Sequence, residues 1–524
     1  MIPNYQDSDG EFTYWAYSAT CGDYYQVGGA KYYQDANGNQ LEATEENKAN
    51  NVLVATNADT VQQYADAGFN VMFINWGATL YGASPSNYQT YFNNSVVKTI
   101  MDLAWEHKIK CFVYSTALHS LSSSHTSLIV GEGNGDGTNT FDTQADLNAF
   151  VGKILYGIKD HPAFYGVSFV DEPFFTQFDA MSEVYQAVQA VAPGAFCNMN
   201  LNPMSYDIRA MVRYDQASYN KWYNANYFET DENGKLTTVL KDGVENKVAT
   251  DSAMEAAYKN YINLYHQKIG KYCGYIQYDS YPMIYYYSTN FLYTHIRNAQ
   301  IVAELCEETG MRFGHVYQTY KDVASTGKRA IDANDIAWQL NFGMAMGVKD
   351  HSYYTYYPVL NSSALPDENY TFVNREGTPN DTYYTVQDLH SNMSVMAKAL
   401  AHFEYRGMKY YTKGNIDSSM QSALNIVKNN DAFDSKMSGV TLSSNGLVLT
   451  TELYDEEMGR YGYFVMNATN PKNVVIATQT VTLSFNGYSN VQIYQDGVVN
   501  TYRLTNGTIE LTLTEAAGAF VIPY

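Results

Sequence analysis

The chain has few positive charges and few charges altogether. Of its 524 residues, 32 are Lys or Arg and 54 are Asp or Glu, so the formal net charge is -22 with only 16% of residues charged. Nucleic acids and anionic membrane surfaces both bind through clustered positive charge, so neither is predicted as a partner. A neutral or cationic ligand fits this charge better.

Long hydrophobic runs are also missing. No stretch of about eighteen apolar residues occurs, so no bilayer-spanning helix is predicted. The first residues, MIPNYQDSDGEF, contain neither a basic nor an apolar segment, so this chain carries no signal peptide. Because aromatic residues make up 15% and charges are sparse, we expect a secreted or cell-surface protein whose signal peptide has been removed, in preference to a cytoplasmic one.

Cysteine and metal-binding motifs are scarce. Of five cysteines, Cys111, Cys197 and Cys273 each open a predicted strand and Cys306 lies in a predicted helix, which is typical of small apolar core residues. There is no HExxH motif and no close pair of Cys or His ligands, and the glycine-rich loop 132–142 lacks the terminal Glu of a calcium loop. We therefore predict neither a metal nor a cofactor.

What the chain does have is a repeated alternation of strand and helix. Short β-branched or aromatic runs alternate with longer segments of helical period, which indicates consecutive β-α units and a parallel sheet. Eight such units, without a glycine-rich phosphate loop after the first strand, favour a (β/α)8 TIM barrel over an open doubly wound sheet. The runs begin at Phe12, Val71, Lys110, Phe164, Phe196, Tyr272, Arg312 and His351.

The pattern changes near residue 410 to strands alone. Alternating apolar and polar residues are punctuated by Asn-Gly and Asp-Gly turns, which predicts a small antiparallel β-sandwich. The sequence therefore predicts an α/β chain of two domains, a barrel over 1–408 and a β-sandwich over 409–524.

One strand runs directly into a pair of carboxylates. The stretch FYGVSFVDEPFF at 164–175 ends its apolar run at Asp171 and Glu172, and Pro173 follows. Active sites of such barrels lie at the carboxyl ends of the strands, so these side chains are predicted at the barrel mouth. The alternative is a helix cap or a surface ion pair.

The motifs HPAFYGVSFVDEP, YADAGFNVMFINW and GYIQYDSYP, with the C-terminal sandwich, resemble the glycoside-hydrolase-type barrels of carbohydrate-degrading bacteria. This resemblance implies that Glu172 is the general acid that protonates the glycosidic oxygen. Many retaining members place a nucleophilic Glu at the end of strand seven. This chain has Gln318 there and so departs from that pattern, which speaks against the usual double-displacement mechanism.

Glycoside hydrolysis needs a second group, and two are available. Asp279, at the end of the sixth strand, could act as base or nucleophile, or it could hold the loop before Pro282. In the hexosaminidase-type barrels, the Asp of an adjacent Asp-Glu pair steers a 2-acetamido group of the substrate that acts as nucleophile. Asp171 matches that position in the sequence. Adjacent residues of a strand face opposite sides, so Asp171 and Glu172 can both reach the site only if the strand has already broken at Asp171.

Other polar and aromatic residues near the strand ends suit a carbohydrate. Amides bind sugar hydroxyls and aromatic faces stack on pyranose rings, although each tyrosine could instead be packing. These candidates are Asn75, Trp76, His119, Asn200, Asn202, Tyr281, Tyr317, Gln318, Tyr354 and Tyr356.

The predicted function is an O-glycosyl hydrolase acting on an oligosaccharide or polysaccharide, whether retaining or inverting. A non-catalytic carbohydrate-binding protein on a degenerate barrel is the alternative, since the usual Glu of strand seven is absent. A transglycosylase would use the same residues. The residues predict no oligomeric state.

Overall fold

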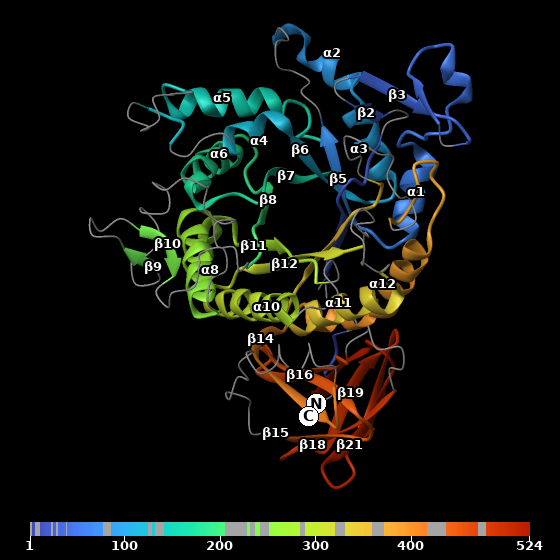
Figure 1. Ribbon diagram of the computed structural model, residues 1–524, viewed down its shortest axis with the longest axis vertical. Coiled ribbons are helices and arrows are strands. Elements are labelled where there is room, and N and C mark those ends of the chain that lie inside the picture. Colours follow the sequence, from blue (N-terminus) through green and yellow to red (C-terminus); the bar gives the residue numbers. More distant parts are fainter. Residues whose placement is uncertain are drawn as a thin grey trace. The chain divides into compact units, whose positions relative to one another are not determined.

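The structure is a computed structural model of the chain (Figure 1). It describes residues 3–5, 11–21, 25–27, 30–37, 39–76, 85–123, 128–131, 141–204, 228–230, 236–240, 251–282, 289–319, 331–358, 371–416, 436–469 and 478–524. The glycine-rich loop 132–142 lies outside these residues except for Phe141 and Asp142. The chain divides into two compact units, Phe73–Asp279 with Thr309–Met311, and Met1–Met72 with Ser280–Glu308 and Arg312–Tyr524.

The main sheet has eight strands in the order β1-β13-β12-β11-β8-β7-β6-β5, and the strand pairs whose register is defined are parallel. Just before β5, the Asn70 backbone N–H donates to the Tyr14 carbonyl at 3.2 Å, so the chain entering β5 lies against β1 and the barrel nearly closes. The predicted barrel is confirmed. Its strands are β1 (Thr13–Ala16), β5 (Val71–Trp76), β6 (Lys110–Ser115), β7 (Phe164–Asp171), β8 (Phe196–Leu201), β11 (Tyr275–Asp279), β12 (Arg312–Gln318) and β13 (Asp350–Tyr354).

Helices follow the barrel strands where the apolar period predicts them. Capping boxes begin three of them, with Asn57, Thr143 and Asp332 as N-caps. Gly310, at φ +70°, follows the last residue of α10, as is typical of the glycine that ends a helix. The helices are α1 (Ala58–Asp66), α2 (Tyr88–Asn93), α3 (Val96–Glu106), α4 (Thr116–Ser123), α5 (Gln144–Ile154), α6 (Phe178–Val191), α8 (Asp251–Tyr265), α9 (Lys271–Cys273), α10 (Thr289–Thr309), α11 (Ala333–Ala345) and α12 (Asp381–Leu400).

The segments after β6 and before β11 are helical. The serine-rich segment after β6 forms α4, with Leu118, Leu121 and Ser122 buried on one helical face. Cys273 was expected to open a strand, but it ends α9. Gly274 at φ +65° terminates that helix, so β11 begins only at Tyr275.

Short hairpins extend from the barrel units. β2 (Tyr25–Val27), β3 (Ala30–Gln34) and β4 (Gln40–Glu42) form an antiparallel sheet. β9 (Phe228–Thr230) and β10 (Leu236–Leu240) form an antiparallel pair, and residues 231–235 between them lie outside the described residues.

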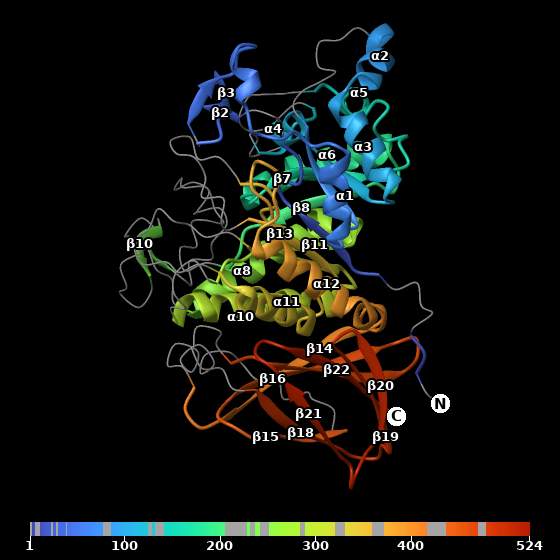
Figure 2. The same ribbon diagram turned by 90° about the vertical axis from the view of Figure 1, so that its right-hand side faces the viewer.

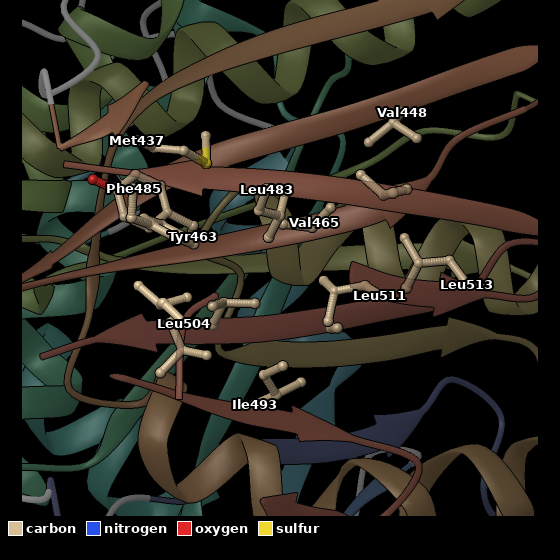
Figure 3. Packing of buried hydrophobic residues seen from close by; sticks show 14 of the residues in the cluster. Met437, Val448, Tyr463, Val465, Leu483, Phe485, Ile493, Leu504, Leu511 and Leu513 are labelled. Atoms are coloured by element: carbon tan, nitrogen blue, oxygen red, sulfur yellow. The ribbon is translucent and has the colours of Figure 1, made fainter. Parts of the chain in front are cut away.

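The C-terminal region is the predicted β-sandwich. One antiparallel sheet has the order β14-β16-β17-β22-β19-β20 and the other β15-β18-β21. Apolar residues from both sheets form one core, among them Val465 from the first and Leu483 and Leu511 from the second (Figure 3). The strands are β14 (Glu404–Lys413), β15 (Met437–Leu442), β16 (Gly446–Asp455), β17 (Arg460–Asn467), β18 (Gln479–Phe485), β19 (Asn490–Gln495), β20 (Val498–Arg503), β21 (Thr508–Leu513) and β22 (Gly518–Pro523).

The sandwich is braced against α11 within its own compact unit. The Trp338 indole N–H donates to the Ala468 carbonyl at 3.2 Å, and the Asn341 amide donates to the Ala516 carbonyl at 3.0 Å. Figure 2 shows β14 and β22 beneath α11 and α12. β14 begins at Glu404, so the predicted boundary at 408 falls inside this strand; the division into two domains stays a prediction.

No helix among the described residues is long and apolar enough to cross a membrane.

Candidate active site

Carboxylates from two strands meet through one amide at the carboxyl end of the sheet. Asp171 ends β7 and Asp279 ends β11, and Asn200 of β8 lies between them. The Asn200 Nδ2 donates to Asp171 Oδ1 at 2.9 Å and to Asp279 Oδ1 at 3.2 Å. The site therefore assembles inside the unit Phe73–Asp279 from residues far apart in sequence.

The backbone turns sharply at Glu172. Asp171 is still in register with Asn200 on β8, and the Glu172 N–H donates to the Asn200 carbonyl at 2.8 Å. Glu172 then adopts φ +44°, a left-handed conformation that costs a non-glycine residue on the order of 1 kcal/mol or more. A strand break at Asp171 was the condition for both carboxyls to reach the site; Asp171 is still part of β7, and the break comes one residue later, at Glu172. This turn directs the Glu172 side chain toward Asp279.

Glu172 and Asp279 share a side-chain hydrogen bond, which lowers the pKa of Glu172 against the rise that burial causes. A hydrogen bond between two carboxyl groups needs a proton on one of them, so the two titrate as a pair. Asp279 is only 5% exposed, and its burial, followed by the charges of Glu172 and Asp171, raises its pKa well above the ordinary value. The pair therefore tends to keep one proton.

Asp171 and Glu172 are exposed on one side and crowded by protein on the others. This partial loss of hydration raises the pKa of both, and for Glu172 the neighbouring Asp171 charge raises the pKa further. Hydrogen bonding to Asn200 opposes the rise in the pKa of Asp171. Solvent access leaves both carboxyls able to meet a ligand.

His119 of α4 lies beside Asp171. Their charges interact, but burial is the larger effect and lowers the pKa of His119, so its ring is neutral near pH 7. The ring packs on Tyr114, with centroids 5.6 Å apart. His119 is therefore a neutral imidazole next to Asp171.

A layer of polar residues beneath the carboxylates was not predicted. Ser168 Oγ donates to Asn198 Oδ1 at 3.2 Å, the Asn198 amide donates to Gln277 Oε1, and the Tyr275 hydroxyl donates to the same oxygen at 2.8 Å. Asn198 and Gln277 each lie two residues before a site residue. Polar residues at every second position of a strand are the signal that could have found them.

The other predicted site residues fall into four groups. Asn202 is 5% exposed and its amide donates to the Pro173 carbonyl at 2.9 Å, next to Glu172. Asn75 is exposed at the end of β5, and the side chain of Trp76 lies outside what the structure describes. Tyr281 and Tyr354 are half-buried in the other unit, with ring centroids 6.0 Å apart.

The remaining residues lie in the core rather than at a mouth. Tyr317 is fully buried, and its hydroxyl hydrogen-bonds to His351 Nδ1 at 2.9 Å. Tyr356 is 1% exposed and stacks on Phe372. Gln318 is also 1% exposed. Its backbone N–H donates to Gln339 Oε1 at 3.0 Å, and its backbone carbonyl accepts from Gln339 Nε2 at 3.1 Å.

Among the described residues, no group of three or more His, Cys, Asp or Glu side chains is arranged to hold a metal ion.

No protein-family model matches the chain, and no curated protein matches its sequence. Three similar solved structures are a glycoside hydrolase family 5 protein from Bacteroides vulgatus (10% identity, TM-score 0.41, covering 89% of this chain and 86% of that one), a family 39 glycoside hydrolase from Bacteroides cellulosilyticus (9%, 0.40, 89% and 78%) and a glucosidase from Croceicoccus marinus (9%, 0.39, 91% and 92%). These likenesses are too weak to assign an activity or a residue.

Removing the buried carboxyl of Asp279 is expected to flatten the pH dependence of stability. Its pKa in the folded state is raised, so its favourable contribution is complete below the ordinary value of 3.8 and is lost as pH rises through the folded pKa. Over that window the free energy of unfolding falls by up to about 1.4 kcal/mol per pH unit. Asp279→Asn keeps the shape, and the Asn200 amide can still donate to it.

Thermal unfolding of wild type and Asp279→Asn between pH 4 and pH 8 checks this. We expect the melting temperature of the wild type to fall further over that range than that of the variant, with Asp160→Asn, an exposed surface change, following the wild type. Parallel curves for wild type and Asp279→Asn would show that this carboxyl ionises as it does in water.

Proposed function

We propose that the protein is a glycoside hydrolase in which Glu172 protonates the glycosidic oxygen. The observation that carries the proposal is the hydrogen-bonded pair of Glu172 and Asp279 at the carboxyl ends of barrel strands. A general acid must hold a proton near the working pH. Burial and the Asp171 charge raise the pKa of Glu172 and favour that state, and the hydrogen bond with Asp279 offsets only part of the rise. Its exposure lets it reach a substrate.

The contact between Glu172 and Asp279 bears on the second group. Retaining glycosidases hold their two carboxyls about 5–5.5 Å apart and inverting ones about 6.5–9.5 Å apart, on opposite sides of the scissile bond. A carboxyl that hydrogen-bonds to the acid lies beside it rather than across the sugar. This favours Asp279 as the proton-sharing partner of Glu172 over Asp279 as base or nucleophile.

Asp171 is then the group that completes the reaction. Asn200 orients its Oδ1, and its exposure leaves the carboxylate open to a substrate N–H. We propose that a 2-acetamido oxygen of the substrate attacks the anomeric carbon while the bond to the leaving oxygen breaks and Glu172 transfers its proton to that oxygen. Asp171 accepts a hydrogen bond from the acetamido N–H and balances the positive charge of the cyclic intermediate. Water then attacks the anomeric carbon, the bond to the acetamido oxygen breaks, and the Glu172 carboxylate takes the proton of that water. A secreted or cell-surface location belongs to the same proposal.

A carbohydrate-binding protein without hydrolysis is the second candidate. The observation in its favour is Gln318, whose neutral amide ends β12 where the resemblance leads one to expect a nucleophilic Glu. Such a protein would bind sugars in the same mouth without using the proton of the Glu172 pair.

Aryl glycosides with and without a 2-acetamido group separate these functions. We expect the wild type to release the aryl alcohol only from the 2-acetamido sugars. Cleavage of plain glycosides that depends on Asp279 would replace the substrate-assisted mechanism with a two-carboxylate mechanism. Saccharide binding by calorimetry with no release from any member of the panel would favour the binding protein.

A further inference from the structure

The backbone that follows Glu172 is held by side chains from two other elements. The Pro173 carbonyl accepts two hydrogen bonds, one from the Tyr261 hydroxyl at 2.6 Å and one from the Asn202 amide at 2.9 Å. On its other side, the Glu172 N–H donates to the Asn200 carbonyl at 2.8 Å. Backbone groups on both sides of the left-handed residue are therefore fixed.

Tyr261 is the central member of this arrangement. Its hydroxyl donates to Pro173 and also accepts the Asn202 backbone N–H at 3.3 Å. The ring has no exposed surface and packs on Phe178, with centroids 5.2 Å apart. A buried ring in fixed packing gives the hydroxyl a defined position from which to hold the turn.

We propose that Tyr261 is a positioning residue for Glu172. By fixing the Pro173 carbonyl, its hydroxyl offsets the cost of φ +44° at Glu172 and keeps that carboxyl directed at Asp279 and the substrate. The inference rests on the proposed function for its catalytic consequence, whereas the placement of the Glu172 carboxyl can be tested without any substrate.

The hydroxyl is suited to this role because it stays a donor. Burial is the main cause that raises the pKa of Tyr261, and the nearby charges of Glu172 and Asp279 raise that pKa further. A phenol that never ionises in the working range holds the carbonyl at every pH at which the acid acts.

Tyr261→Phe tests the proposal, with Tyr265→Phe as a matched control. Both tyrosines belong to α8 and are fully buried, and both hydroxyls donate to a backbone carbonyl, that of Tyr265 to Tyr275 at 3.0 Å. Each variant keeps its ring and loses the two hydrogen-bond contacts of its hydroxyl, so both are expected to lose stability. Only Tyr261→Phe is expected to lower kcat, by at least about tenfold with KM within about twofold, because Glu172 acts in the transition state.

A loss of stability alone does not shift the pH dependence of activity, so that dependence tests the positioning role separately. Activity requires protonated Glu172, so it falls as pH rises through the pKa of that group. If the carboxyl of Glu172 turns out toward water in Tyr261→Phe, its pKa drops toward 4.5, and this basic limb moves to lower pH. The basic limb of Tyr265→Phe is expected to coincide with that of the wild type.

A titration without substrate separates this inference from the proposed function. With 13C-labelled glutamate carboxyls, the Glu172 signal is identified as the one missing from Glu172→Gln, and its apparent pKa is measured in each variant. A lower value in Tyr261→Phe and an unchanged value in Tyr265→Phe support the positioning role even if no glycoside is cleaved. Equal values in wild type and Tyr261→Phe overturn it even if the wild type is an active hydrolase.

Asn202→Ala removes the other donor to Pro173 and provides the test if Tyr261→Phe does not fold. The same downward shift in the Glu172 titration is expected. An unshifted titration in a folded Asn202→Ala protein would also overturn the proposal.

Discussion

Glu172→Gln is expected to lower kcat/KM for aryl glycosides by about 100- to 10,000-fold, the usual contribution of a general acid. Glutamine has nearly the same shape and can still hydrogen-bond to Asp279, but it carries no proton to give to the leaving oxygen. Initial rates near pH 6 measure the loss. The melting temperature is expected to stay the same or rise, because one of three crowded carboxyls has been removed.

Glu183→Gln is the matched control for this experiment. The Glu183 carboxyl accepts the Ile129 backbone N–H at 2.6 Å, and partial burial raises its pKa, yet it belongs to α6 and takes no part in the candidate site. We expect this variant to keep its activity. Activity of Glu172→Gln within about threefold of the wild type would contradict the assignment of the acid.

Asp171→Asn is expected to lower kcat for 2-acetamido glycosides by about 100- to 1,000-fold, the effect of removing one preorganised group that meets developing charge. The variant loses the negative charge that balances the cyclic intermediate, while its Oδ1 can still accept the Asn200 amide. A stable thiazoline analogue of that intermediate should bind the wild type and bind the variant more weakly by a comparable factor.

The pattern across two variants distinguishes the mechanisms. If Asp171→Asn leaves cleavage intact while Asp279→Asn abolishes it, the nucleophile or base is Asp279 and substrate assistance is excluded. If Asp171→Asn is nearly inactive and Asp279→Asn mainly moves the pH profile, Asp279 acts through the proton of Glu172. The hydrogen bond between Glu172 and Asp279 favours the second pattern.

The barrel could be predicted because each of its strands and helices has a signal in the local sequence. The run VMFINW forms β5, which begins at the predicted Val71, and Asn57 with Thr60 begins α1 as a capping box. Such signals depend on neighbours along the chain. The convergence of Asp171, Asn200 and Asp279 could also be predicted, since the carboxyl ends of parallel strands meet at one edge.

Contacts that depend on the path of the backbone could not be predicted. The Glu172–Asp279 hydrogen bond depends on φ +44° at Glu172, and the dipeptide Asp-Glu carries no sequence signal for this left-handed conformation. Tyr317 and Gln318 were both predicted at the mouth, although adjacent strand residues face opposite sides. Tyr317 is fully buried and hydrogen-bonds to His351, so its side chain lies in the core and not at the mouth.

Tyr261 was missed for a related reason. In sequence it is one of several tyrosines on an amphipathic helix, and its spacing to Tyr258 and Tyr265 is that of a buried helix face. Its role depends on where α8 packs relative to the end of β7, which helical periodicity does not encode.

The most direct test of the central claim, that Glu172 protonates the leaving oxygen, is the dependence of kcat/KM on the pKa of the leaving phenol. We predict that wild-type rates vary little across a series of aryl glycosides, because the enzyme supplies the proton. For Glu172→Gln we predict a steep increase in rate as the phenol becomes more acidic, with dinitrophenyl substrates approaching the wild-type rate. Parallel slopes for the two proteins would contradict the claim.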